Sequence, residues 1–109
     1  MVTSSKRAEA TERTGIVARR LRAAREAAGL SQKELGLKAG LDPSVASPRI
    51  NQYERSKHVP NTAVLGQIGT VLQQPLAYFY ALDDEMADLI TAFHRATQRE
   101  RKAILALLA

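Results

Sequence analysis

The segment from Ser47 to Glu54 contains three side chains, Arg49, Asn51 and Gln52, that can hydrogen-bond to the edges of DNA bases. Asn and Gln can pair with adenine through two hydrogen bonds, and Arg can pair with guanine in the same way, each pair discriminating by ~1–3 kcal/mol. Taken alone, these residues are more typical of a solvated helix face. The choice between the two interpretations depends on the elements around the segment.

Other residues with chemical potential lie in patterns that favour structural roles. His58 and His94 have no carboxylate or Cys at ligand spacing, and the chain contains no Cys, so we expect no metal site. Ser31 has no His or Asp at catalytic spacing, which argues against nucleophilic catalysis. Acidic residues at one helix start are favoured by the helix dipole, with calcium binding a distant alternative; they are Asp83, Asp84, Glu85 and Asp88. We therefore expect neither an enzyme nor a cofactor.

The composition is that of one small helical domain with an anionic partner. Hydrophobic residues make up 45% of the 109 residues, enough for a core, and the abundant Leu and Ala favour helices. The net charge is +5 and is uneven: residues 1–30 hold seven Lys and Arg against three Glu, whereas residues 83–109 hold four against five acidic residues. Nucleic acid is the first candidate partner for such a chain. We see no secretory signal and no membrane-spanning run, and expect a cytoplasmic, nucleoid-associated protein without membrane contact.

Apolar periodicity and capping signals predict a series of helices. The first begins at Ile16 and stops at Gly29, and residues 1–13 before it are expected to be a flexible basic arm. The second is short and starts with a capping box between Ser31 and Glu34. These two helices are separated only by a tight turn.

The third helix is expected to begin at Ser47, because Pro48 would break a longer helix, and to end near Glu54. Asn61 caps a fourth helix, and Pro75 opens a short fifth one. Some glycines inside the helices are expected where other elements pack closely; they are Gly36, Gly66 and Gly69.

Two short helices joined by a turn, the second polar on its outer side, form a helix-turn-helix. The segments LRAAREAAGLSQKELGLKAG, INQYERSKHVP and LGQIGTVLQQPLAYF resemble the Cro/repressor-type (XRE, lambda-repressor-like) helix-turn-helix family over about residues 16–82. The separation of Gly40 from Glu54 is longer than usual for that family, and DPSVASP holds the extra residues. The matching residues are Arg25, Leu30, Ser31, Gln32, Leu35, Gly40, Ile50, Glu54, Pro60, Leu65, Ile68, Leu72 and Phe79.

This resemblance implies an all-α fold and sequence-specific binding to double-stranded DNA. A five-helix lambda-repressor-like helix-turn-helix domain would span residues 14–82, followed by two C-terminal helices over residues 83–109. Ile50 would anchor the third helix in the core. The side chains facing the major groove would be Ser47, Arg49, Asn51 and Gln52.

The resemblance also implies residues that hold the DNA backbone and the helix itself. Gln32, at the start of the second helix, would bind a phosphate through its side chain or nearby backbone N–H groups. Arg25 and Glu54 match a structural ion pair between the first and third helices. The other phosphate contacts are assigned to Lys33, Arg55, Ser56 and Lys57.

The C-terminal segment is richer in apolar residues than a DNA-binding domain of this size needs. One helix follows Asp83, and another follows a capping box from Thr97 to Glu100. These helices would either pack back on the domain or form a homodimer interface, and we favour the dimer because a two-fold dimer matches a palindromic site. The inner face of the first of them is expected to be formed by Met86, Leu89, Ile90 and Phe93.

Two function hypotheses follow from these patterns. The first is a transcriptional regulator, a repressor, that acts as a homodimer on operator DNA. The alternative is a protein-interaction module, such as an antitoxin or a bridging factor, whose C-terminal helices bind a partner protein.

Overall fold

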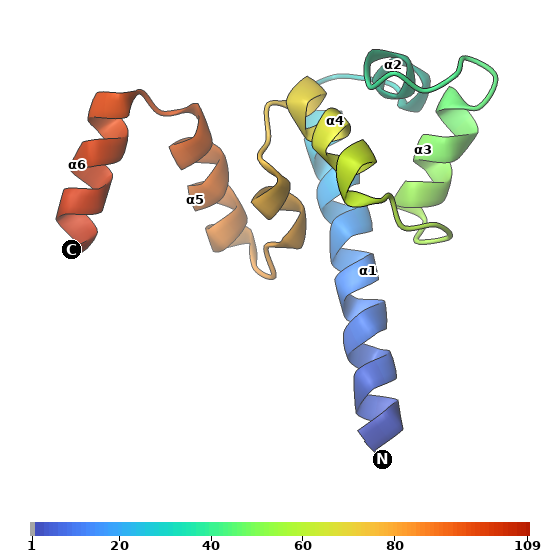
Figure 1. Cartoon of the computed structure of the whole chain (residues 1–109), viewed down its shortest axis with the longest axis horizontal. Helices are drawn as coiled ribbons and strands as arrows, with labels where there is room; N and C mark the ends of the chain where they lie inside the picture. The colour runs from blue at the N-terminus through green and yellow to red at the C-terminus, as the bar shows by residue number, and fades with distance from the viewer. Residues whose placement is uncertain (1) are drawn as a thin grey trace.

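The computed structural model describes the backbone of residues 2–109 and the side chains of residues 15–109. All regular structure in this range is helical, as the sequence predicts (Figure 1). The fifth element is a 3₁₀ helix rather than an α-helix. In chain order the elements are α1 (Val2–Ala27), α2 (Gln32–Lys38), α3 (Ala46–Glu54), α4 (Thr62–Leu72), η1 (Leu76–Tyr80), α5 (Asp84–Arg95) and α6 (Gln98–Leu108).

Helix α1 is longer than predicted, because it begins at Val2 rather than at Ile16. The basic arm expected over residues 1–13 therefore coincides with the first part of this helix, and its side chains lie outside those that the structure describes. The predicted stop is confirmed at Gly29, which has φ 69°. The Leu30 N–H donates to the Arg25 carbonyl at 3.2 Å, which closes the last turn of α1.

The predicted capping signals are confirmed, since each starts the helix assigned to it. Ser31 and Glu34 form a capping box at α2, Asn61 caps α4, and a second box opens α6 after Thr97. Asp83 accepts from the Met86 N–H at the start of α5. Local side-chain chemistry thus sets most helix starts in this chain.

Helix α3 starts at Ala46, one residue before its predicted start at Ser47. Pro48 lies in its first turn, where a missing N–H leaves no helical hydrogen bond unmade. The extra residues before α3 form a separate turn in which Asp42 accepts from the backbone N–H of Ser44 at 2.8 Å. The insertion therefore lies outside the helix and does not extend it.

The core lies between α1, α2, α3, α4 and η1, and α2 packs mainly against α3. Aliphatic side chains fill most of it, consistent with the low aromatic content. The largest fully buried side chains are Leu21, Leu35, Ile50, Leu65, Ile68 and Phe79.

Of the three helical glycines that were predicted to lie at close contacts, two do and one does not. A Cβ on Gly36 would lie 2.8 Å from the Cβ of Ala46, and a Cβ on Gly69 would lie 2.6 Å from the Gln74 carbonyl oxygen. Gly66 has no described neighbour within 4 Å of the same position, so its predicted role in close packing is wrong.

Replacing Gly36 with alanine is expected to lower the free energy of unfolding by about 1–3 kcal/mol, because α2 and α3 would have to separate. Gly66→Ala is the matched control, and it is expected to raise that free energy by about 0.5–1 kcal/mol because a helical glycine with room for a Cβ is replaced. Chemical denaturation of both variants measures the difference. Equal effects would contradict the close contact between Gly36 and Ala46.

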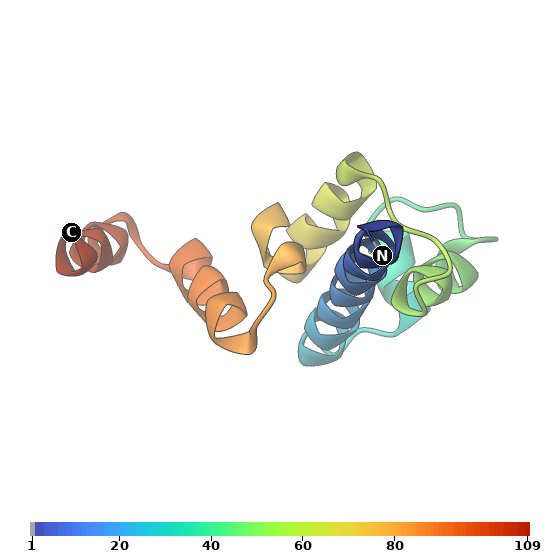
Figure 2. The ribbon, with the colours of Figure 1, turned by 90° about the horizontal axis from the view of Figure 1, so that it is seen from below.

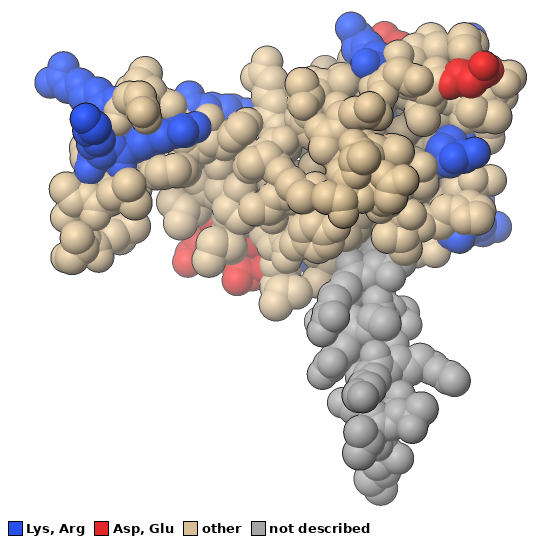
Figure 3. Space-filling model, viewed as in Figure 1, with Lys and Arg blue, Asp and Glu red and all other residues tan. Residues whose placement is uncertain are grey.

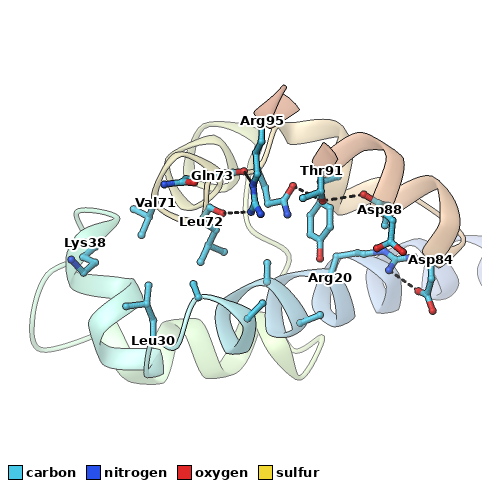
Figure 4. Close-up of a pocket in the computed structure, with 17 residues that line it drawn as sticks. Arg20, Leu30, Lys38, Val71, Leu72, Gln73, Asp84, Asp88, Thr91 and Arg95 are labelled. Carbon is cyan, nitrogen blue, oxygen red and sulfur yellow. Dashed lines mark hydrogen bonds and ion pairs between the residues drawn. The ribbon is translucent and has the colours of Figure 1, made fainter. Parts of the chain in front are cut away.

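Helix α5 is joined to the rest of the domain largely through polar contacts beside a groove of about 670 Å³ (Figure 4). Arg20 donates to the carbonyl of Ala81 at 3.0 Å and to Asp84 at 2.8 Å, and it lowers the pKa of the Asp84 carboxyl. Arg95 donates to the backbone carbonyls of Leu72 and Gln73. Arg20 is 5% exposed, so its guanidinium is buried at this contact rather than solvated.

The predicted inner face of α5 is confirmed at Ile90, which packs against the core, but not at Met86 and Leu89. Ala87 is the buried residue of this helix, whereas Met86 and Leu89 are 48% and 46% exposed. Helix α6 has no buried residue, and it stands apart from the helical domain in both views (Figures 1 and 2). The apolar faces of α5 and α6 instead line a shared groove of about 470 Å³.

Candidate nucleic-acid interface

The apolar side of helix α3 packs into the core, and the opposite side of the helix is uncovered. Ala46, Ile50 and Tyr53 are buried, with exposed fractions of 0%, 0% and 6%. The outer side carries Arg49 and Gln52. Figures 1 and 2 place α3 at the end of the molecule remote from α5 and α6, so the C-terminal helices do not cap its polar face.

The four residues expected to contact bases occupy different parts of α3. Arg49 is exposed, and Gln52 is half-buried beside it in a hollow of about 340 Å³. Asn51 lies at the side nearer α2, where its amide bonds to Gln32. Ser47 is half-buried in the first turn. The structure therefore brings Arg49 and Gln52 together in one surface hollow at the outer side of the helix.

His58 and Asn61 line the same hollow as Arg49 and Gln52, and the sequence reasoning gave neither a place in the interface. His58 was weighed only as a metal ligand and Asn61 only as a helix cap. The feature of the sequence that could have placed them in the interface is their position next to the basic residues that follow α3.

The residues expected to contact phosphates surround α3 at the surface. Figure 3 shows separate basic side chains over α2 and α3 with acidic ones among them, a denser basic group over α6, and acidic side chains near the start of α5. Gln32 is half-buried, and its side chain is already engaged by α3. The exposed members of the set are Lys33, Arg55, Ser56 and Lys57.

The turn after α3 gives the basic loop a defined direction. Ser56 has φ 58°, in the left-handed region that glycine usually occupies at the end of a helix. The Lys57 N–H donates to the Gln52 carbonyl at 2.9 Å, closing the last turn. Arg55, Ser56 and Lys57 therefore leave α3 in a fixed arrangement rather than as a loose strand.

Arg25 and Glu54 form an ion pair between α1 and α3. Arg25 Nε donates to Glu54 Oε2 at 2.6 Å and Arg25 Nη2 to Glu54 Oε1 at 3.0 Å, and the two side chains are 13% and 3% exposed. The hydrogen bond to Glu54 raises the pKa of Arg25. A third donor, Arg25 Nη1, bonds the Leu30 carbonyl in the turn before α2 at 2.8 Å. One guanidinium thus fixes α1, the turn before α2, and α3 relative to one another.

Gln32 connects the start of α2 to α3. Its Nε2 lies 3.2 Å from Asn51 Oδ1 and 3.2 Å from Glu54 Oε1. An amide nitrogen has two hydrogens, and both are used in these contacts. In this arrangement the side-chain N–H groups of Gln32 are not free for a phosphate.

Two kinds of site are absent from the part of the chain that the structure describes. No described helix is long and apolar enough to cross a bilayer. No three His, Cys, Asp or Glu side chains among the described residues cluster in a way that would hold a metal ion.

Comparison with known proteins places this architecture among helix-turn-helix proteins, since residues 21–79 match the helix-turn-helix family. The crystal structure of the transcriptional regulator BswR is similar, with 44% identical residues and a TM-score of 0.78. That similarity covers 84% of this chain and 90% of the other. A search of curated protein sequences finds no significant match. The chain belongs to the Cro/repressor-type (XRE) helix-turn-helix family, as its sequence pattern predicts.

Proposed function

We propose that this chain is a DNA-binding transcription regulator that recognises a specific sequence by placing α3 in the major groove. The observation that supports this most directly is the uncovered polar face of α3, where the exposed Arg49 and the half-buried Gln52 line one surface hollow. An α-helix fits the major groove of B-form DNA, where every base pair shows a distinct pattern of donors and acceptors. The similarity to a transcriptional regulator agrees with this assignment.

In this proposal the bases are contacted from α3 and the phosphates from its surroundings. Ser47, Arg49, Asn51 and Gln52 are the base-contacting set. The cationic side chains that approach the DNA backbone are Lys33, Arg55 and Lys57, with Ser56 between the last two. Such phosphate contacts orient the protein without specifying a sequence.

We further propose that two chains act together as a homodimer through α5 and α6. Several large apolar side chains on these helices are exposed in the single chain: Leu105 is 58% exposed, Leu107 84% and Leu108 70%. Contiguous apolar surface of this kind marks an interaction site. A two-fold dimer would present two α3 helices to the two halves of a palindromic site. A dimer of this kind, bound over an operator, would act as a repressor by blocking other proteins from the same DNA.

The same apolar surface supports one other function, that of an interaction module such as an antitoxin or a bridging factor. Here α5 and α6 would bind a different protein. Purification with one stoichiometric partner and no preference for any DNA sequence would favour that function over the proposed one.

Selection of bound duplexes from a random DNA pool tests the main proposal. We expect a palindromic sequence with two half-sites about one helical turn apart. Binding should weaken steeply with salt while the sequence preference persists. Loss of all sequence preference at physiological salt would overturn the proposal, and a site without two-fold symmetry would overturn the homodimer.

Replacing Gln52 with alanine is expected to weaken binding to the selected site by about 10- to 100-fold, since a good base contact contributes ~1–3 kcal/mol of discrimination. The fold should persist, because Gln52 lies on the outer side of α3. Gln67→Ala, at an exposed position of α4, is the control and should bind as the unchanged protein does. If the Gln52 variant binds every site variant normally, the proposed orientation of α3 on DNA is wrong.

A further inference from the structure

Helix α5 is attached to the helical domain by directed hydrogen bonds and by little apolar surface. Its buried residue is Ala87, whose side chain is a single methyl group. Ile90 adds a partly buried contact with the core. Apolar burial is non-directional, so a contact this small leaves the direction of α5 to its hydrogen bonds.

Arg20 holds the start of α5. Its Nε donates to the Ala81 carbonyl at 3.0 Å, just before the helix, and its Nη1 donates to Asp84 at 2.8 Å, in the first turn. A guanidinium is a planar fork with fixed donor directions, so these two bonds define where the helix begins. At the other end of α5, Arg95 donates to two backbone carbonyls at the end of α4 (Figure 4). Two separate attachments fix the axis of a helix, whereas a single attachment leaves a pivot.

The burial of Arg20 is poorly explained by stability alone. Its side chain is 6% exposed, whereas that of its partner Asp84 is 86% exposed. Its third nitrogen, Nη2, is buried without a hydrogen-bond partner among the described residues. Removing a guanidinium from water costs free energy, and an apolar side chain of similar volume is often no less stabilising at such a position. What an apolar side chain cannot supply is the pair of directed bonds.

The helix that carries Arg20 also carries the residue that holds α3. Arg25 lies five positions after Arg20 and forms the ion pair with Glu54. Five positions correspond to about 7.5 Å along a helix axis. Because α1 is continuous over both arginines, it is a rigid frame between the two contacts. The direction of α5 relative to α3 therefore depends on the bonds that α1 makes to each of them.

From this arrangement we infer that Arg20 is a positioning residue that sets the separation of the two DNA half-sites. The inference rests on the proposed function, a dimer through α5 and α6 that reads DNA with α3. In such a dimer the distance between the two α3 helices depends on how each domain is attached to its own α5. Moving one half-site by one base pair shifts it by about 3.4 Å along the duplex and turns it by about 35° around the axis. A rigid attachment rejects that change, and a loose one accommodates it.

The affinity for duplexes with altered spacing tests the inference. The two half-sites of the selected palindrome are kept, and the spacing between them is changed by one or two base pairs in either direction. The unchanged protein should bind the altered duplexes at least about tenfold more weakly than the selected one. Asp84→Ala removes the exposed end of the Arg20 contact, and this ratio should fall to about threefold or less. Glu85→Ala, which removes the same charge from the same turn of α5, is the control and should leave the ratio as it is in the unchanged protein.

A duplex with a single half-site separates positioning from direct contact with DNA. Arg20→Met and Asp84→Ala should both bind it within about twofold of the unchanged protein, because neither residue lies on α3. A purely structural role for Arg20 would weaken binding to every duplex by the same factor and leave the spacing ratio unaltered. Thermal melting and analytical ultracentrifugation establish whether each variant is folded and dimeric. If Arg20→Met fails to fold, the ratio measured for Asp84→Ala decides.

Different results overturn different proposals. A spacing ratio that stays as high in Asp84→Ala as in the unchanged protein would refute the role of Arg20. A folded but monomeric Asp84→Ala would also refute it, because Arg20 would then maintain the dimer rather than its geometry. Equal binding of all spacings by the unchanged protein would mean that α5 is attached loosely from the outset. Absence of any preferred sequence, or a selected site without two-fold symmetry, would instead refute the proposed function.

Discussion

Replacing Ile50 with alanine is expected to lower the free energy of unfolding by about 2–5 kcal/mol, the range for truncating a buried aliphatic side chain. Ile50 is 0% exposed and belongs to the cluster that joins α3 to α1 and α4. The rigid surrounding helices cannot close the cavity fully, so packing contacts are lost together with the transfer free energy. The same change should weaken DNA binding, because α3 loses the contact that sets its position.

Denaturant unfolding followed by circular dichroism measures this loss. Val59→Ala is the control, since Val59 is 60% exposed and the change should alter stability by no more than about 0.5 kcal/mol. A loss below about 1 kcal/mol for Ile50→Ala would mean that the side chain does not fill the core as the structure shows.

Replacing Glu54 with leucine is expected to cost about 3–5 kcal/mol, the usual cost of removing one partner of a buried ion pair. The guanidinium of Arg25, 13% exposed, would be left without its carboxylate, and Gln32 would lose an acceptor. Most of the loss comes from the unpaired charge rather than from the attraction itself. The double variant Arg25→Met with Glu54→Leu removes that charge and should therefore recover part of the stability.

The chain offers a matched control for this experiment. Arg22 and Glu26 form an ion pair within α1, 3.0 Å apart and 66% and 56% exposed. Glu26→Leu should change the free energy of unfolding by no more than about 0.5 kcal/mol, because solvent screens an exposed pair. Thermal and denaturant melts of the unchanged protein, the single variants Arg25→Met, Glu54→Leu and Glu26→Leu, and the double variant provide the comparison. A double variant as unstable as the sum of its two single variants would contradict the coupling of Arg25 and Glu54.

The sequence predicted those parts of the fold that depend on a few neighbouring residues. Capping requires one side chain within hydrogen-bond reach of the next turn, so Ser31, Asn61 and Thr97 marked their helix starts correctly. Gly29 ended α1 because the left-handed conformation favours glycine. The core position of Ile50 was implied by the family resemblance, and its 0% exposure confirms it.

The features that the sequence did not predict depend on contacts between distant residues. Arg20 lies in a basic cluster, and only the approach of α5 and its Asp84 reveals that this guanidinium is buried. Helix α5 has small and large apolar residues on adjoining sides. Its burial at Ala87 rather than Met86 follows from how closely η1 and α1 approach it.

The candidate site was likewise predictable only where it depends on neighbouring residues. The residue types on α3 indicated which side of the helix is polar, but not that Gln32 of α2 hydrogen-bonds to both Asn51 and Glu54 of α3. The periodicity of residues within one helix contains no information about hydrogen bonds to another helix.

The segment between α2 and α3 has a consequence for how this scaffold can vary. Both ends of α3 are attached to other helices: Ala46 rests on Gly36, and Glu54 is held by Arg25. Residues 42–44 are exposed, and the turn closes on itself through Asp42. The entropic cost of closing a surface loop rises only slowly with its length. Residues can therefore be added to this stretch without changing the orientation of α3.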